Sequence, residues 1–125
     1  MNILAIDFGT KYIGLAWVGH GVDVVLPYGR VAYTVWKQEL PQLIRDEKIN
    51  HVVVGIPYHA EDGTETENSR RVRAFIRELE QLISVSVTTV DERFTTKEAQ
   101  VMEGDATLDE KAAMLMLQQY LSATD

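Results

Sequence analysis

Hydrophobic residues follow two patterns along this chain: short β-branched runs and longer stripes at helical spacing. Three runs near the N-terminus predict strands, over 3–7, over 13–18, and near 22–26 or 30–33. Glycine and proline separate these runs at short intervals. Because the connections are short, we expect the three strands to form an antiparallel meander.

Predicted helices and strands alternate in the rest of the chain. A helix is expected over 35–48, with its regular part beginning near Pro41 because proline disrupts a helix interior. An apolar run predicts a buried central strand over 51–57. A fifth strand is expected over 85–90. The clearest helical stripe lies between them and consists of Val72, Phe75, Ile76, Leu79, Leu82 and Ile83.

Two capping-box patterns mark helix starts in the last third of the chain. Thr95 begins one and predicts a short helix to about Met102, and Thr107 begins another and predicts a final helix to about Leu121. A meander followed by alternating helices and strands is typical of an α/β fold. We therefore expect one domain over 1–125, a five-stranded mixed sheet with its first three strands antiparallel and helices against it.

Composition narrows the class of protein. The chain has 125 residues, 46% of them apolar and 25% charged, and no cysteine. It has no apolar run long enough for a bilayer and no visible secretory leader, so we expect a cytoplasmic protein without membrane contact. The absence of cysteine excludes disulfides and thiolate zinc sites. The sequence motifs of zinc proteases, serine hydrolases and P-loop NTPases are absent as well.

The charge balance bears on nucleic-acid binding. Twelve basic and nineteen acidic side chains give a net charge of −7, which weighs against indiscriminate binding to phosphate backbones. Arginines gather at Arg70, Arg71, Arg73 and Arg77, directly after an acidic stretch. A solvated helix face of mixed charge explains that cluster better than a nucleic-acid surface does.

Acidic residues stand where two predicted strands end. Asp7 follows an apolar run and precedes Gly9, which is expected to supply a turn conformation, and Asp91 and Glu92 follow another β-branched run. A carboxylate at the end of a buried strand costs free energy unless a cation or hydrogen-bond donors compensate it. The alternative is that Asp7 only opens a turn through its own side-chain hydrogen bonds.

Four blocks of sequence together resemble a known family. They are 7–11 with Gly14, 53–57 with 62–64, 91–96 with Glu98 and Ala99, and Asp109 with Ala112, Ala113, Leu117 and Gln118. In this order they resemble the YqgF family, also called RuvX, of ribonuclease-H-like proteins, over almost the whole chain. The first block alone would also suit actin-like ATPases, but the chain lacks room for their second lobe.

The resemblance implies a metal site built from acidic residues. The positions that match are Asp7, an acid of the Asp91–Glu92 pair, and Asp109, which would hold Mg²⁺ or Mn²⁺ for phosphodiester hydrolysis. Neighbouring strand residues face opposite ways, so either member of the pair could point inward; the longer arm of Glu92 favours it. Asp109 also has a purely structural explanation, since it lies in the first turn of a helix.

Cations near these acids would contact substrate phosphates. Thr10, Lys11 and Arg93 are the candidates. The chain departs from the family at Tyr12, where arginine is usual, and over 102–106, which is acidic rather than basic. Both departures remove positive charge that could hold a nucleic-acid backbone.

The resemblance therefore implies a metal-dependent endonuclease acting on structured nucleic acid, in processing of the 5′ end of pre-16S rRNA. One alternative is cleavage of four-way DNA junctions, which would favour a two-fold symmetric dimer. Another is a nucleic-acid-binding, transcription-associated module without catalysis. The sequence leaves open whether the protein is a monomer or a homodimer.

Overall fold

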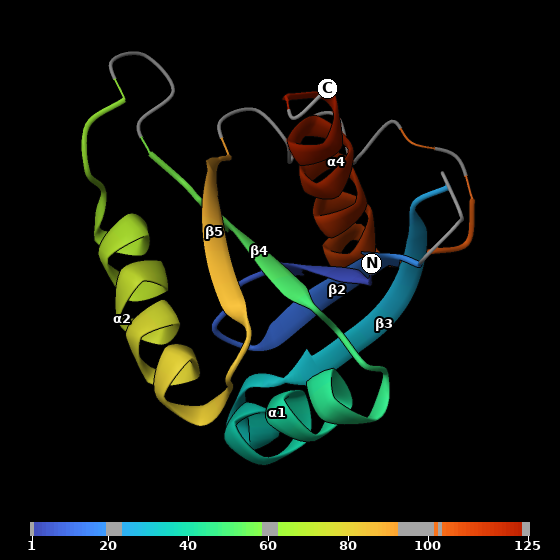
Figure 1. Ribbon diagram of the computed structural model, residues 1–125. Coiled ribbons are helices and arrows are strands. Elements are labelled where there is room, and N and C mark those ends of the chain that lie inside the picture. Colours follow the sequence, from blue (N-terminus) through green and yellow to red (C-terminus); the bar gives the residue numbers. More distant parts are fainter. Residues whose placement is uncertain (1, 20–23, 59–62, 93–101, 103, 124–125) are drawn as a thin grey trace.

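A five-stranded mixed sheet forms the centre of the protein in a computed structural model that describes residues 2–19, 24–58, 63–92, 102 and 104–123 (Figure 1). The strand order is β3-β2-β1-β4-β5, with β1, β2 and β3 antiparallel and β1, β4 and β5 parallel. The predicted mixed sheet, antiparallel over its first three strands, is confirmed. The strands are β1 (Ile3–Asp7), β2 (Tyr12–Val18), β3 (Leu26–Ala32), β4 (His51–Ile56) and β5 (Ser86–Asp91).

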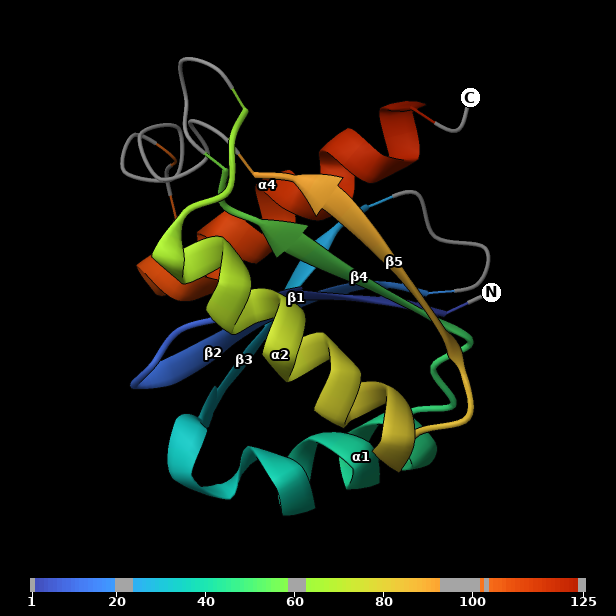
Figure 2. The same cartoon turned by 90° about the vertical axis from the view of Figure 1, so that its left-hand side faces the viewer.

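Helices cover both faces of this sheet. Helices α1 and α2 lie against one face and α4 lies against the other (Figure 2). The short helix expected after Thr95 falls outside the described residues. None of the helices in the described part of the chain has the length and apolar character that a bilayer crossing requires. The helices are η1 (Tyr33–Val35), α1 (Trp36–Asp46), α2 (Glu67–Leu82) and α4 (Leu108–Ala123).

Two predicted boundaries were wrong, both at prolines. The regular part of α1 begins at Trp36, and Pro41 lies buried inside the helix. Burial of α1 against the sheet stabilises the helix despite the backbone hydrogen bond that Pro41 cannot make. The third strand spans Leu26–Ala32, between the two predicted positions, and it accommodates Pro27 because it is an edge strand.

Side-chain alternation along β1 divides the interior into two cores. Leu4 and Ile6 point into the core under α1 and α2, whereas Ile3 and Ala5 point into the core under α4. Asp7 continues the α4 side of this alternation. The central strand is therefore buried on both faces until it reaches its first charged residue.

Both α2 and α4 begin with a reciprocal cap. At the start of α4, the Thr107 hydroxyl accepts a hydrogen bond from the Glu110 amide (3.1 Å), and Glu110 Oε1 accepts one from the Thr107 amide (2.9 Å). This confirms the capping box predicted at Thr107. At α2, Thr66 and Ser69 cap each other in the same way. The cap at Thr107 sets where α4 starts and so fixes the position of Asp109 at its first turn.

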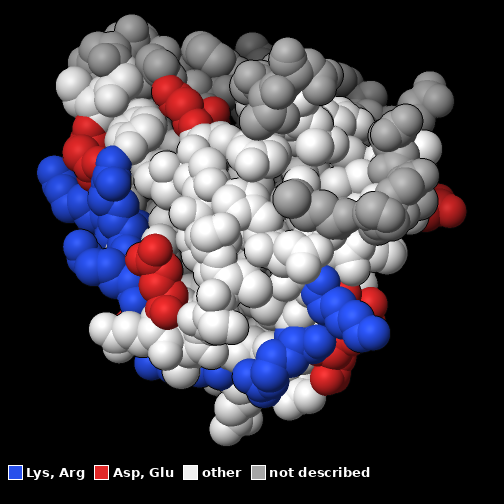
Figure 3. Space-filling view, viewed as in Figure 1, with Lys and Arg blue, Asp and Glu red and all other residues white. Residues whose placement is uncertain are grey.

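The arginines of α2 form an exposed face of mixed charge. Figure 3 shows basic side chains along the left edge of the molecule, where α2 lies in Figure 1, with acidic side chains among them. Arg71 pairs with Glu67 at 3.0 Å and Arg73 with Glu65 at 2.7 Å. All four arginines are exposed, so they lie on a helix face of mixed charge as the sequence predicts.

Helix α4 packs so closely against β2 that the position of Gly14 has no room for a side chain. A Cβ at Gly14 would stand 2.2 Å from the Asp109 carbonyl oxygen, which belongs to backbone and cannot swing aside. We expect Gly14→Ala to push α4 outward and to lower the free energy of unfolding by about 1–3 kcal/mol. Thermal unfolding followed by circular dichroism measures this loss.

Gly55→Ala is the matched control for this substitution. A Cβ at Gly55 would meet the ends of the Met116 (2.5 Å) and Glu92 (2.7 Å) side chains, which can shift at a lower cost than backbone can. We expect a smaller decrease in melting temperature than for Gly14→Ala. A Gly14→Ala variant that melts with the parent protein would contradict the close α4 contact.

Candidate active site

Two predicted site residues meet at the edge of the sheet where the parallel strands end. Asp7 is the last residue of β1, and Glu92 directly follows β5. The Glu92 amide donates a hydrogen bond to the Ile56 carbonyl at 3.0 Å, which holds the chain beside β4 as it leaves the sheet. A side-chain hydrogen bond joins the carboxyl groups of Asp7 and Glu92.

Strand alternation sends Glu92, rather than Asp91, to the α4 face. Val90 packs into the core under α4, and Glu92, two residues further along, lies on the same side. Asp91 is exposed and points to the opposite side. The structure therefore brings Glu92 to Asp7 and does not bring Asp91 there.

Two glycines flank Asp7 and make room for the other acids. Gly14 is the partner of Asp7 on β2, and the parallel register that pairs Ile6 with Val54 puts Gly55 beside Asp7 on β4. The Asp109 backbone lies over Gly14, and the Glu92 carboxylate lies over Gly55. The sequence analysis did not assign these glycines to the site. A glycine in the interior of a strand often marks a place where another group approaches the backbone closely, and this could have indicated them.

Burial raises the pKa of the Asp7 carboxyl, and the negative charge of Asp109 raises it further, whereas the hydrogen bond with Glu92 lowers it. Two carboxyl groups can hydrogen-bond only by sharing a proton. The surroundings of Asp7 therefore disfavour its charged form, although two other acids lie close to it. A cation that replaced the shared proton would relieve this repulsion.

Asp109 lies in the first turn of α4 and contacts an arginine that the sequence analysis missed. Arg30 Nη1 is 3.8 Å from Asp109 Oδ2, and the Arg30 guanidinium lies over the Tyr12 ring, 3.8 Å from its centroid. Glu110 accepts a hydrogen bond from the Gly29 amide at 2.7 Å, which ties β3 to α4 beside this contact. Tyr12 therefore holds a cation near the acids although it carries none itself.

Two further predicted residues lie at the β1–β2 turn. Thr10 and Lys11 are exposed there, and the Lys11 carbonyl accepts a hydrogen bond from the Tyr33 amide at 3.0 Å. Gly9 is needed for space and not for the expected turn conformation, because its φ is not positive and a Cβ would stand 2.2 Å from the Tyr12 carbonyl oxygen. Arg93 lies outside the described residues.

The three acids do not form a closed cluster. Asp7 and Glu92 are in contact, and Asp109 acts on Asp7 through its charge while it faces Arg30. No group of three or more histidine, cysteine, aspartate or glutamate side chains has the arrangement of a metal centre within the described residues. A carboxylate pair with a third acid nearby is the arrangement that the structure provides.

Comparison with solved structures identifies the class of fold. The chain is similar to the RuvC structure of Thermus thermophilus, with a TM-score of 0.62, 14% sequence identity, and coverage of 99% of this chain and 97% of that one. At this identity the likeness establishes the fold alone. The protein has the RuvC-like, ribonuclease-H-like fold that the sequence resemblance implied.

Comparison of sequences identifies the family. The family model described as "RuvX: Holliday junction resolvase" matches residues 1–123. A relative from Dictyoglomus thermophilum is 33% identical, covering 99% of this chain and 97% of its own; one from Maridesulfovibrio salexigens is 33% identical, covering 98% of each. Both are named "Putative pre-16S rRNA nuclease". The chain belongs to the RuvX family, which confirms the expected family and its nuclease class.

The electrostatics of Asp7 predict how stability depends on pH in the presence of a chelator. Because burial raises its folded-state pKa above the ordinary value of 3.8, the folded protein holds the proton more tightly than the unfolded chain. Stability is then lost as pH rises from 3.8 through the folded-state pKa. Asn cannot ionise, so we expect Asp7→Asn to be more stable than the parent protein at neutral pH, and the difference to shrink towards pH 4.

Urea unfolding between pH 4 and pH 8 measures this difference. Adding Mn²⁺ provides the control, because a cation bound to the folded state should stabilise the parent protein and not the variant. A parent protein that matches or exceeds Asp7→Asn in stability at neutral pH without metal would contradict the raised pKa.

Proposed function

We propose that this protein is a divalent-metal-dependent endonuclease that hydrolyses phosphodiester bonds in structured RNA, with the 5′ end of pre-16S rRNA as its substrate in the cytoplasm. The observation that carries the proposal is the contact between Asp7 and Glu92 at the mouth of the sheet, with Asp109 beside it. Family membership and the printed names of the relatives support the choice of substrate.

The acids fit Mg²⁺ or Mn²⁺. Their donor atoms are carboxylate oxygens, the ligands that these hard cations prefer. Asp7 and Glu92 are in contact only through a proton, which a metal ion would displace. Asp7 and Glu92 would hold the ion, and Asp109 would join them when its contact with Arg30 is exchanged for one with substrate.

When bound, the cation activates a water molecule and neutralises charge on the phosphate. The chain's own residues supply the positioning. The central strand β1 holds Asp7, a backbone hydrogen bond to Ile56 holds Glu92 beside β4, and the cap of α4 holds the backbone at Asp109, so Asp7 and Glu92 need little rearrangement. Burial around Asp7 lowers the local dielectric and strengthens its interactions with charged groups.

Exposed cations around the acids suit the backbone of a nucleic acid. Arg30 and Lys11 stand near the mouth of the site, and a guanidinium binds phosphate through paired hydrogen bonds. The Thr10 hydroxyl can donate to a phosphate oxygen. Arg93 is proposed as a further phosphate contact from its sequence position alone.

Cleavage of four-way DNA junctions is the second candidate function. The family description supports it, and the chain is also similar, at a TM-score of 0.62, to the T. thermophilus protein titled "RuvC in complex with Holliday junction substrate". That activity would favour a two-fold symmetric homodimer, whereas RNA processing can use a monomer. Light scattering and cleavage assays on both substrates separate the two candidates.

Single substitutions of the acids test catalysis. We expect Asp7→Asn and Glu92→Gln to lower the cleavage rate of a 5′-extended 16S rRNA fragment by at least about a hundredfold, since each removes a proposed metal ligand. Asp91→Asn is the matched control, because the neighbouring Asp91 is exposed and points to the other side. It should cleave at close to the parental rate.

The assay compares gel-resolved products from all four proteins, purified identically, with Mg²⁺ and with chelator. Circular dichroism shows whether each variant is folded. Cleavage by Asp7→Asn at the parental rate would trace the activity to a contaminant and remove the nuclease proposal for this chain. Binding of the RNA by every variant without cleavage by any would favour the non-catalytic module.

Arg30 is predicted to act mainly in substrate binding. We expect Arg30→Ala to raise KM about five- to tenfold with a smaller effect on kcat, the scale of one lost hydrogen bond of ordinary strength at an exposed site. Arg30→Lys should recover only part of this, because lysine lacks the planar group that lies over Tyr12. Steady-state cleavage measures both constants.

Arg45→Ala serves as the control for Arg30→Ala. Arg45 is also exposed, but it belongs to α1 on the opposite face of the sheet from α4. An equal effect of the two substitutions would show that only net charge matters and would remove the specific role of Arg30.

A further inference from the structure

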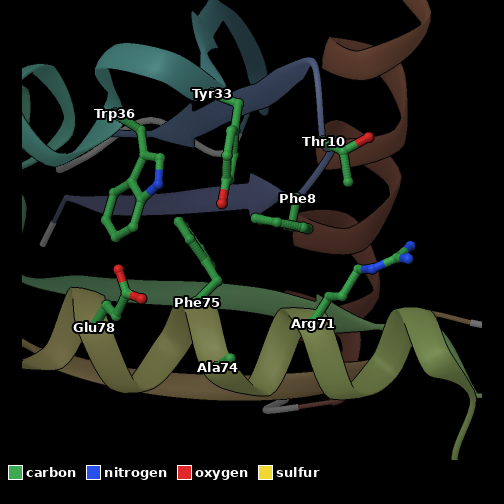
Figure 4. A pocket seen from close by; sticks show the side chains of 8 residues that line it. All are labelled: Phe8, Thr10, Tyr33, Trp36, Arg71, Ala74, Phe75 and Glu78. Carbon is green, nitrogen blue, oxygen red and sulfur yellow. The ribbon is translucent and has the colours of Figure 1, made fainter.

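An aromatic cavity of about 300 Å³ lies on the face of the sheet opposite the three acids. Figure 4 shows Phe8 and Tyr33 above helix α2, with Phe75 rising from α2 below them and Trp36 of α1 at the end away from Thr10. The rings contact one another: Trp36 and Phe75 centroids are 4.6 Å apart, and Phe8 and Phe75 centroids are 4.9 Å apart. Four aromatic rings therefore line the cavity, together with Thr10, Arg71, Ala74 and Glu78.

The rings divide into buried and accessible members. Trp36 and Phe75 are 3% and 4% exposed and belong to the core, as expected for aromatics at core positions. Tyr33 is 44% exposed, and its ring meets Phe8 edge-on with centroids 5.9 Å apart. A flat ligand could therefore stack on Tyr33 without disrupting the core.

The cavity adjoins the acids through the β1–β2 turn. Phe8 directly follows Asp7, with Cα atoms about 3.8 Å apart, and alternation points the two side chains to opposite faces. A nucleic-acid strand crossing this edge with one phosphate at Asp7 would bring a neighbouring nucleotide to Phe8. That spacing links the cavity to the catalytic edge within one or two nucleotides.

One end of the cavity offers groups for a phosphate. Thr10, on the β1–β2 turn, and Arg71, on α2, both lie at that end (Figure 4). Arg71 pairs with Glu67 at 3.0 Å, but the two side chains are 52% and 80% exposed, so the pair is weak and can open. A guanidinium released from Glu67 can bind a phosphate oxygen.

We propose that this cavity binds an unpaired nucleobase of the substrate strand, stacked on Tyr33, with the phosphate of the same nucleotide at Thr10 and Arg71. The proposal rests on the proposed nuclease function. The stacked base fixes the position of the strand across the β1–β2 turn. The enzyme thereby selects a cleavage position next to an unpaired nucleotide.

Size and chemistry favour a base over other occupants. The volume lies at the lower end of small-molecule sites, roughly 300–1,000 Å³, so it suits one planar ring system. Stacking on an aromatic ring beside a cation is the usual way proteins bind unpaired bases. A peptide side chain would gain from the rings but would have no need of Thr10 and Arg71 at the end of the cavity.

Fluorescence of a substituted base tests the proposal. The protein is the inactive Asp7→Asn variant, and the probe is an RNA hairpin with a single-stranded 5′ flank that carries 2-aminopurine at one flank position at a time. We expect quenching at a single position, adjacent to the bond that the parent protein cleaves. Adding Tyr33→Ala should abolish that quenching and weaken binding about 5- to 150-fold, the range for loss of one base–aromatic stack.

Tyr33→Phe is the matched control, because it keeps the ring and removes only the hydroxyl. It should quench and bind like the parent variant. Quenching that survives Tyr33→Ala, or an abasic flank that binds as tightly as the intact one, would overturn the proposal. Equal loss in Tyr33→Phe would also overturn it, since the ring would then not be the binding group.

A second pair of variants tests the phosphate end. Arg71→Gln should weaken binding of the same hairpin several-fold, whereas Arg77→Gln, on the same helix but outside the cavity, should not; equal losses would overturn the Arg71 assignment. Failure of this inference is distinguishable from failure of the function. If the active protein cleaves RNA and Tyr33→Ala cleaves it equally well at the same position, only the cavity proposal is lost.

Discussion

The close contact between the Asp7 and Glu92 carboxyl groups is the interaction on which the rest of the site depends. It exists because β1 and β5 run parallel, with β4 between them, and so end at the same edge of the sheet. Gly14 and Gly55 leave space on either side of Asp7, into which Asp109 and Glu92 fit. The fold thus gathers negative charge at a point where burial already disfavours it.

The same edge connects two different environments. On the α4 face, charged groups meet: the acids, and Arg30 stacked on Tyr12. On the α1 and α2 face, aromatic rings line a cavity of moderate size. The two environments lie on opposite faces of the sheet but come close together at the β1–β2 turn, because Asp7 and Phe8 are consecutive residues whose side chains point to opposite faces. A single substrate strand that follows this turn would use charge for the reaction and stacking for its position.

The order of the described strands and of helices α1, α2 and α4 could be predicted from the sequence. The spacing of apolar residues and the positions of turn residues are local properties of the chain. The capping box at Thr107 was likewise readable, because its reciprocal hydrogen bonds join two residues only three positions apart in the sequence. The start of α1 and the limits of β3 were not, because burial against the sheet and an edge position overrode the local preference of proline.

Some residues of the candidate site could likewise be predicted from the sequence, and others could not. Asp7 and Glu92 were recognisable from strand ends and from the family resemblance. Arg30 was not, since nothing in its local sequence shows that β3 passes α4 at Asp109. The aromatic cavity was also missed. Its lining comes from the β1–β2 turn, η1, α1 and α2, which lie far apart in the sequence, and its buried rings, Trp36 and Phe75, each match a core position.

Mn²⁺ binding by crystals of the parent protein tests the central claim most directly, because manganese gives an anomalous signal. The account predicts a peak about 2.0–2.2 Å from carboxylate oxygens of both Asp7 and Glu92, at the typical metal–oxygen distance. Crystals saturated with Mn²⁺ that show peaks elsewhere, while Asp7 and Glu92 keep their mutual hydrogen bond, would contradict it.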